Sequence, residues 1–460
     1  MQPVATLVSD PVRSRTPGQI MSAFGRGELI SASISQSEER DLFAWARLKR
    51  EKLTDELHSA KSSGSVRQAR RAIRCYRTSL AVRLIHLWEA TPPEHRPSAH
   101  DTVEEAEKKR QRRLDEVFSR ASSVSNMQRP AEGRLRYKSK GGGRYRPILS
   151  FGWSDTTRFE MLAASVKPFA GFHASQFQLH PQPGSRGQQA ACRELLTRLN
   201  GIHRTEAAPG GGRRVDEPIF MELDVRNFFG SVSEDWWANK PILDADMRCQ
   251  LYTGRMRIKA NRKVRGRFDG ALDDWVRRGL PQGSALSALI AEWVMADVLG
   301  GLPDLPDAVG MITYCDNIGL IGPRDQIDAV VELIREVFRT SRAGPFNLLV
   351  KQEVVLSGQP IRFLGMEFAQ EGGWVIRPPA GQLEAVMLQT RTDIDHAFSA
   401  DCFARIRRKV LGKAAAWNRW SKVSEWSANL LLEVRIAESL ARGIKAPFYR
   451  STRTGVPTPI

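Results

Sequence analysis

The sequence predicts an α+β protein in which an antiparallel sheet is flanked by helical segments toward both ends of the chain. Between residues 220 and 376, apolar patterns follow the order strand, helix, strand-turn-strand, helix, strand, which is typical of an antiparallel sheet backed by helices. Residues 37–90 and 382–460 instead carry apolar side chains at helical spacing. Residues 1–35 show no periodicity and are expected to form a flexible lead-in.

The composition points to a globular protein with a polyanionic partner. Lys and Arg number 69 against 51 Asp and Glu, a net charge of +18, and hydrophobic residues make up 41% of the chain. An excess of positive charge of this size favours nucleic acid as the partner, although it would also suit an acidic membrane surface. No apolar run reaches the roughly 18 residues that a membrane-spanning helix needs, so no membrane span is expected.

The cysteines bear on metal binding and on the compartment. The five cysteines lie far apart and include no Cys-x-x-Cys pair, so they predict neither a zinc site nor a disulfide framework. The first residues lack the short apolar core of a secretory signal. A reducing, cytoplasmic location is therefore expected, while the oligomeric state stays open.

A predicted hairpin at residues 312–321 carries a carboxylate at its tip. Apolar residues on both sides are interrupted by Tyr314, Asp316 and Asn317. An ionised carboxylate at a buried turn is costly unless it is paired or bound to a metal ion. Taken alone, the pattern also fits an ordinary Asx turn.

Two further stretches change the interpretation of this hairpin. Residues 220–232 predict a strand that ends at Asp224 and leads into a Phe-Phe pair, and residues 279–289 predict a Gly/Pro loop that enters an apolar helix. In this order and spacing, the three stretches resemble motifs A, B and C of reverse transcriptases. The bacterial enzymes of group II introns, retrons and defence systems are the most similar.

The resemblance continues on both sides of these motifs. Residues 362–368 match the family's Phe-Leu-Gly primer-grip strand, and residues 140–148 match its basic fingers hairpin. The resemblance implies a right-hand polymerase with a helical, basic N-terminal extension at 1–130, fingers and an antiparallel palm sheet at 131–376, and a helical thumb at 377–460.

The resemblance also implies two divalent ions, Mg²⁺ or alternatively Mn²⁺, held by Asp224 and Asp316. Such ions prefer carboxylate oxygens and promote attack of a 3′-hydroxyl on an α-phosphate. The family usually has a second Asp where this chain has Asn317, whose amide oxygen can act as a ligand but brings no charge. The family's motif D lysine is also hard to place, because Lys351 is near its position but offset.

Other matched positions concern the incoming nucleotide. Lys140 and Arg146 match the basic residues that hold its triphosphate. Gln282 matches the motif B glutamine that lies beside the nucleotide, and Gly283 lets the backbone come close to it. Phe229 matches an aromatic steric gate that selects dNTPs, although it could also be core packing like the phenylalanine before it.

Basic segments are the candidates for contact with nucleic acid. A Gly-Arg loop enters a helix near residue 188, residues 255–267 contain seven basic residues and no acidic one, and basic residues alternate with tryptophans in the predicted thumb. Solvated surfaces and a plain three-helix bundle are the alternatives. The residues expected to contact nucleic acid are Arg186, Arg262, Lys263, Arg265, Arg408 and Lys409.

These observations favour an RNA-directed DNA polymerase that uses dNTPs to make a DNA product. The partner is expected to be a structured RNA, either template or guide, in a bacterial accessory or antiphage defence element. The alternatives are a group II intron-type maturase and reverse transcriptase, untemplated or protein-primed DNA synthesis, and a catalytically weak RNA-binding protein that keeps the polymerase shell.

Overall fold

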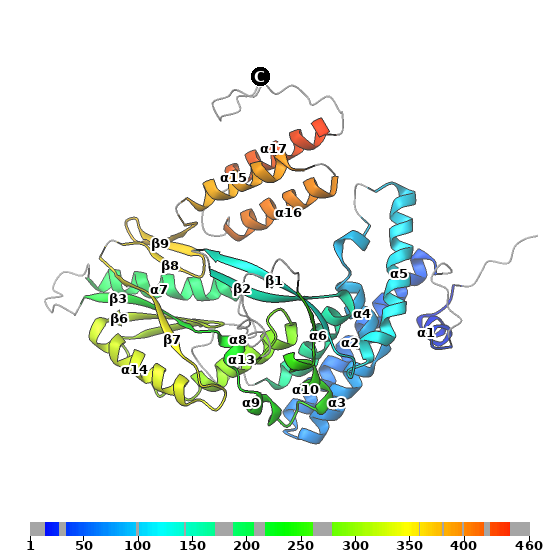
Figure 1. Cartoon of the computed structure of the whole chain (residues 1–460), viewed down its shortest axis with the longest axis horizontal. Coiled ribbons are helices and arrows are strands. Elements are labelled where there is room, and N and C mark those ends of the chain that lie inside the picture. Colours follow the sequence, from blue (N-terminus) through cyan, green and yellow to red (C-terminus); the bar gives the residue numbers. More distant parts are fainter. Residues whose placement is uncertain are drawn as a thin grey trace, which may run out of the picture. The chain divides into compact units, whose positions relative to one another are not determined.

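The computed structural model describes residues 14–26, 34–97, 101–141, 144–170, 187–206, 217–260, 278–357, 359–379, 381–397, 400–417 and 424–441. The chain folds into two compact units and passes between them several times. Figure 1 labels the helices and strands in chain order. Unit 1 contains Met1–Gln176, Val225–Leu302 and Ile334–Leu348, and unit 2 contains Phe177–Asp224, Pro303–Leu333 and Leu349–Ile460. The domain boundaries predicted near residues 130 and 376 stay predictions.

Helices make up the first part of unit 1. The first one begins behind a capping box, in which Thr16 N donates to Gln19 Oε1 at 2.8 Å and Gln19 N donates to Thr16 Oγ1 at 3.4 Å. The expectation of a flexible lead-in is therefore wrong for Pro17–Gly25, because a local cap starts a helix there. The helices are α1 (Pro17–Gly25), α2 (Gln36–Ser62), α3 (Val66–Thr78), α4 (Leu80–Glu89), α5 (Val103–Ser125) and α6 (Trp153–Val166).

Aromatic and cationic contacts hold α2, α4 and α5 together. Phe43 of α2 stacks on Trp88 of α4 with ring centroids 4.0 Å apart. The Arg113 guanidinium of α5 lies 3.2 Å from the centre of the same Trp88 ring. Arg110, also on α5, forms an ion pair with Glu39 of α2 at 2.5 Å. Basic residues of α5 therefore contribute to packing as well as to surface charge.

The predicted basic hairpin is present in unit 1 as β1 (Glu132–Gly141) and β2 (Arg144–Phe151). A short strand, β4 (Arg257–Lys259), adds to β1 in parallel and gives the sheet order β2-β1-β4. Residues 257–259 are thus a strand and not part of the loop predicted over 255–267, because they pair with the start of β1. The basic residues from 261 to 267 lie outside the described residues.

The motif B region of unit 1 is a loop that enters a buried helix, as predicted. α13 (Ala285–Leu299) begins at Ser284, whose side chain accepts a hydrogen bond from Ser287 N, and most of its side chains are buried. It contacts α6 and α8 (Phe228–Ser231). The remaining short elements here are α9 (Glu234–Ala238), α10 (Ala245–Leu251), and the 3₁₀ helices η2 (Pro93–His95), η3 (Lys167–Phe169) and η4 (Thr253–Arg255).

Unit 2 is organised around a four-stranded sheet with the order β5-β6-β3-β7. β3 pairs antiparallel with β6, and β5 and β6 form the predicted hairpin. Backbone bonds from Arg226 N to Asn347 O and from Leu356 N to Pro218 O show that β7 is antiparallel to β3. The strands are β3 (Pro218–Val225), β5 (Gly310–Tyr314), β6 (Asn317–Pro323) and β7 (Leu348–Val355).

An apolar core packs against this sheet. The Phe220 ring on β3 meets the Phe363 ring edge-on, with centroids 5.6 Å apart. The predicted primer-grip strand ends at Phe363, and Leu364 and Gly365 form a tight turn with positive φ angles of 51° and 75°. The other elements of this core are α7 (Gln188–Glu206), β8 (Ile361–Phe363), β9 (Met366–Gln370) and β10 (Trp374–Arg377).

The end of unit 2 consists of α15 (Gln382–Asp395), α16 (Ala400–Trp417) and α17 (Ser424–Ala441). Phe403, Ile406 and Val434 form a small core between α16 and α17. α14 (Arg324–Thr340) leads from unit 2 back into unit 1. None of the helices in the described part of the chain is long and apolar enough to span a membrane.

Candidate active site

Strand register in unit 2 brings the predicted metal-binding residues together. Asp224, near the end of β3, lies directly opposite Asn317, the first residue of β6. Tyr314 and Asn317 close the hairpin, which leaves Cys315 and Asp316 as its two-residue tip. Cys315 has a φ of 53°, as a tight two-residue turn requires at this position. The sheet therefore places Asp224, Asp316 and Asn317 at one edge.

Lys351 of β7 supplies a positive charge at this edge. Its ammonium Nζ donates to Asn317 Oδ1 at 2.6 Å and lies 3.1 Å from Asp224 Oδ1 and 3.3 Å from Glu222 Oε1. The lysine reaches these oxygens because β7 is the direct neighbour of β3 in the sheet. Three oxygen atoms from two strands thus surround one cation.

Glu222 is a site residue that the motif comparison did not find. It lies two positions before Asp224, so strand alternation places both carboxylates on the same face of β3. Its carboxylate is buried and also accepts a hydrogen bond from Gln352 Nε2 at 2.8 Å. Burial raises the pKa of Glu222 above its ordinary value, although Lys351 and Gln352 act in the opposite direction. The period-2 pattern could have identified this second carboxylate.

The oxygen atoms at this edge suit a hard divalent cation. The Lys351 ammonium is a cation bound by carboxylate and amide oxygens, which are also the ligands that Mg²⁺ prefers. Asn317 Nδ2 donates to Asp316 Oδ1 at 3.3 Å, so the tip carboxylate points toward its neighbour. Within the described residues, no three His, Cys, Asp or Glu side chains already converge as a metal-binding group. A metal ion would therefore need Lys351 to withdraw.

Gly283 is required by a close backbone approach within unit 1. It has a φ of 114°, and a Cβ atom at this position would lie 2.0 Å from the carbonyl oxygen of Leu149 on β2. Next to it, Leu149 N donates to Gln282 O at 2.8 Å. The motif B loop is therefore tied to the basic hairpin through its backbone, which leaves the partly buried Gln282 side chain free of this contact.

The two phenylalanines after motif A have different environments. Phe228 is only 4% exposed and packs against Phe346, with ring centroids 5.3 Å apart. Phe229 is half-buried, and its carbonyl oxygen accepts a hydrogen bond from Leu280 N at 2.8 Å. The Phe229 ring is therefore not packed into the core as the Phe228 ring is.

The remaining predicted contacts are dispersed. Lys140 lies in β1, and Arg146 is an exposed residue of β2 opposite Lys138. Arg408 and Lys409 are exposed on α16, and Lys409 Nζ pairs with Asp393 Oδ2 of α15 at 2.7 Å. The predicted residues that lie outside the described part of the chain are Arg186, Arg262, Lys263 and Arg265.

Comparison with known proteins yields structural likeness alone. No protein-family model matches the sequence, and no curated protein matches it. Similar solved structures include telomerase from Candida albicans in complex with a fragment of telomeric RNA, at 12% identity and a TM-score of 0.34, with 70% of this chain and 64% of that chain covered. Apo telomerase from Candida tropicalis, truncated from its C-terminal domain, has 10% identity and a TM-score of 0.31, with 52% and 53% covered.

This chain therefore spans less than two thirds of the length of either telomerase chain. Likeness at this level is too low to assign a family or an activity, both of which depend on the residues of the site.

Proposed function

We propose that this protein is an RNA-directed DNA polymerase that adds dNTPs to a primer 3′-hydroxyl. The observation that carries the proposal is the register of β3 and β6, which sets Asp224 opposite Asn317 and beside the hairpin tip at Asp316. A strand-end carboxylate next to a hairpin-tip carboxylate is the arrangement that a two-ion phosphoryl transfer site needs. A structured RNA partner, in a bacterial accessory or defence element, completes the proposal.

Each residue of the edge has a distinct part in this reaction. When bound, two Mg²⁺ or Mn²⁺ ions would lower the pKa of the primer hydroxyl and stabilise the leaving pyrophosphate. Asp224 and Asp316 would hold them through carboxylate oxygens, and Asn317 would offer a neutral amide oxygen. Lys351 neutralises Asp224 and Glu222 as long as no other cation does so.

The residues that match the family's nucleotide-binding positions would select and hold the nucleotide. Arg146 and Lys140 provide positive charge on the basic hairpin for the triphosphate. The half-buried Phe229 ring would act as the gate against a ribose 2′-hydroxyl, and Gln282 would lie beside the nucleotide on a loop whose backbone is tied to β2. These roles are consistent with DNA as the product.

Primer extension on an RNA template tests the proposal. With dNTPs and Mg²⁺ or Mn²⁺, the wild-type protein should extend a DNA primer, and Asp224→Ala or Asp316→Ala should reduce extension to background while RNA binding persists. Asp325→Ala, which removes an exposed carboxylate of the same unit, is the matched control and should extend normally. Full activity of either site variant would contradict the two-ion assignment.

A second candidate function is RNA binding by a catalytically weak polymerase shell. The amide of Asn317 and the Lys351 ammonium among the site oxygens favour it, because both lower the negative charge available to metal ions. RNA binding by the wild-type protein without any primer extension, in either metal, would support this candidate over the first.

A further inference from the structure

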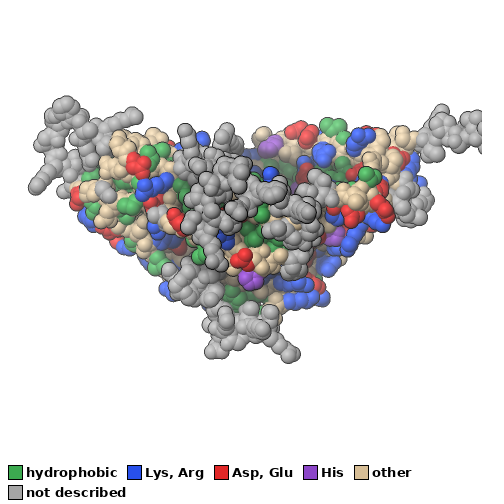
Figure 2. Space-filling view, turned by 90° about the horizontal axis from the view of Figure 1, so that it is seen from above, with side chains coloured by type: hydrophobic (Ala, Val, Ile, Leu, Met, Phe, Trp, Pro, Cys, Tyr) green, Lys and Arg blue, Asp and Glu red, His purple; other side chains and the backbone are tan. Residues whose placement is uncertain are grey.

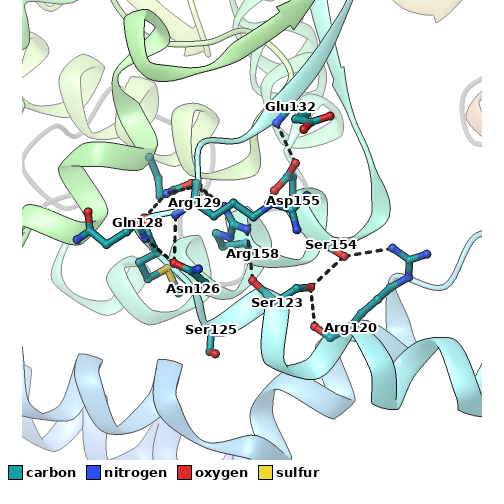
Figure 3. A network of polar contacts seen from close by, with 12 residues as sticks. Arg120, Ser123, Ser125, Asn126, Gln128, Arg129, Glu132, Ser154, Asp155 and Arg158 are labelled. Atoms are coloured by element: carbon teal, nitrogen blue, oxygen red, sulfur yellow. Dashed lines mark hydrogen bonds and ion pairs between the residues drawn. The ribbon is translucent and has the colours of Figure 1, made fainter.

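Unit 1 contains a cavity of about 330 Å³ whose lining includes none of the proposed metal-binding residues. Its walls come from the start of β1, the end of β2, the first turn of α6, the second half of α5 and the end of β4. Figure 3 shows part of these walls, with Arg120, Ser154, Asp155 and Glu132 around the start of α6. Among its lining residues, Lys259 lies in the 255–267 segment that the sequence predicts to contact nucleic acid, and the other lining residues have no predicted role.

Positive charge predominates in the lining. Glu132 and Asp155 are the two acidic lining residues, and both already have partners. Glu132 Oε2 lies 3.1 Å from Lys259 Nζ, and Asp155 Oδ1 lies 3.2 Å from Arg158 Nη2. The basic lining residues are Arg120, Arg129, Arg134, Arg136 and Lys259.

Three of these basic residues are available to a ligand. Arg129, Arg134 and Arg136 are exposed, and none of them forms an ion pair with another described residue. Arg134 and Arg136 project from the same face of β1 because they are two positions apart, and Lys259 lies opposite Arg134 in the parallel pairing with β4. The opposite face of β1 carries buried Leu135, so strand alternation holds the arginines toward solvent.

Hydrogen bonds join the segments that form the wall of the cavity. Arg158 is completely buried and donates from Nη1 to Arg129 O at 3.0 Å and from Nη2 to Ser123 O at 3.4 Å (Figure 3). Asp155 Oδ2 accepts from Glu132 N at 3.0 Å and so ties the first turn of α6 to β1. The backbone segments that carry the basic residues are thus joined by hydrogen bonds, which reduces the backbone entropy lost when a ligand binds.

The first turn of α6 contributes uncapped backbone N–H groups to the cavity, and its one acidic residue, Asp155, is paired with Arg158. This helix of 14 residues begins at Gly152, which provides no side-chain cap, so its first backbone N–H groups point toward the cavity end of the helix without a capping acceptor. A Cβ atom on Gly152 would meet no atom within 4 Å, so this helix start is open.

The aromatic residues of the lining already have partners within the protein. Trp153 Nε1 donates to Leu87 O at 3.1 Å, and the Arg120 guanidinium lies 5.2 Å from the Trp153 ring centre. The Phe151 ring meets the Phe159 ring edge-on, with centroids 4.8 Å apart. The described lining therefore offers cations and backbone N–H groups in preference to aromatic faces on which a base could stack.

From these features we infer that the cavity binds a phosphate group of a nucleic-acid strand without reading its bases. A phosphate presents several acceptor oxygens that match the forked donors of neighbouring arginines. The strand would be held at its backbone, so affinity would depend on salt and not on sequence. The inference concerns binding alone and does not depend on polymerase activity.

Binding of short labelled single-stranded RNA, measured without dNTPs or divalent metal, tests this inference. The Arg134→Gln/Arg136→Gln double variant should bind RNA about tenfold more weakly and should flatten the log–log salt dependence by about one unit for each phosphate that it no longer holds. The control is Arg40→Gln/Arg47→Gln, which removes two exposed arginines of α2 that have no ion pair in the described residues. Equal effects of the two double variants would overturn the inference.

The Gly152→Asp variant distinguishes a phosphate site at the start of α6 from general attraction between RNA and a basic surface. The backbone at Gly152 has φ −69° and ψ 166°, which suits an N-cap aspartate, so the variant should melt no lower than the wild type. The added carboxylate should nevertheless weaken RNA binding, because it repels phosphate at the start of α6. Gly152→Ser, a cap without charge, should weaken binding less. Wild-type RNA affinity in Gly152→Asp would contradict the inference.

The choice of RNA shows whether the cavity binds a phosphate at the strand end or an internal phosphodiester. RNA with a 5′-hydroxyl and RNA with a 5′-phosphate are compared on the wild type and on the Arg134→Gln/Arg136→Gln variant. A loss seen only with 5′-phosphate RNA assigns the cavity to a strand end, and an equal loss with both assigns it to an internal phosphodiester. Slower hydrogen exchange at residues 153–156 with RNA bound is expected in both cases.

Discussion

The proposed metal site of unit 2 and the basic cavity of unit 1 differ in how their charged groups are paired. In the proposed metal site, opposite charges are paired, since Lys351 Nζ lies within 3.3 Å of oxygens from Glu222, Asp224 and Asn317. In the cavity, Arg129, Arg134 and Arg136 are left without ion pairs among the described residues. The first arrangement is stable without a ligand and must open to accept one, whereas the second is completed by an anion.

Surface charge by itself does not reveal this difference. Lys and Arg side chains occur at many points of the face shown in Figure 2, often beside acidic ones. Exposed pairs of this kind contribute little to stability. The two sites differ in whether their charged side chains form ion pairs with neighbouring residues.

The largest expected effect comes from comparing two adjacent residues, buried Phe228 and half-buried Phe229. Phe228→Ala should cost about 3–5 kcal/mol of unfolding free energy, because Phe228 is buried against Phe346. Phe229→Ala should cost clearly less unfolding free energy, because the Phe229 ring is only half-buried. It should also admit rNTPs, because it removes the ring proposed to exclude the ribose 2′-hydroxyl. Chemical denaturation and paired dNTP and rNTP competition measure the two effects. An unchanged sugar preference in folded Phe229→Ala would exclude the gate.

The pH dependence of stability tests the burial of one histidine, His86, in unit 1. Burial lowers the pKa of His86 from 6.5 to about 4, and its Nε2 lies 3.0 Å from the Tyr76 hydroxyl. The unfolded chain therefore binds this proton more tightly than the folded one. The contribution of neutral His86 to the free energy of unfolding is fully present above pH 6.5. It is lost as the pH falls toward 4, and the total loss is about 3 kcal/mol. Denaturation from pH 7.5 to 5 should show this slope in the wild type and a weaker slope in His86→Gln.

A charge reversal in each site tests the comparison directly. Lys351→Glu should cost about 1–3 kcal/mol, because it leaves Glu222 and Asp224 without their cation; the 37% exposure of the Lys351 side chain limits the cost. Arg134→Glu, in the cavity, should change stability by less than about 0.5 kcal/mol because no partner is lost. Urea denaturation of both variants gives the two values. Similar costs would mean that the difference in pairing has no energetic consequence.

The smallest expected effect concerns Asn317→Asp. The added charge should strengthen Mn²⁺ binding severalfold, but the new carboxylate also attracts Lys351, whose Nζ already lies 2.6 Å from Asn317 Oδ1. Metal titration followed by Mn²⁺ electron paramagnetic resonance measures affinity independently of catalysis. Combining Asn317→Asp with Lys351→Met should increase the affinity further. Coincident titrations of all variants would place residue 317 away from the ions.

The local patterns of the sequence were sufficient for individual elements. Alternation and apolar runs predicted the hairpin at 312–321, the strand that ends near Asp224 and the buried helix after the motif B loop, and the structure confirms these elements. Such patterns report which face of an element is buried, and that is a property of neighbouring residues in the chain. The same approach missed α1 and β4, where a cap and a partner strand decide the outcome.

The relations between distant residues were decided only by the tertiary structure. The register that sets Asp224 opposite Asn317, the approach of Lys351 from β7, and the pairing of Lys259 with Arg134 each join segments far apart in sequence. The clash that excludes any side chain at Gly283 likewise depends on Leu149, more than a hundred residues earlier in the chain. Composition alone established that the chain is basic. Which charges are paired and which remain available depends on strand order and packing, because ion pairs form between neighbours in space.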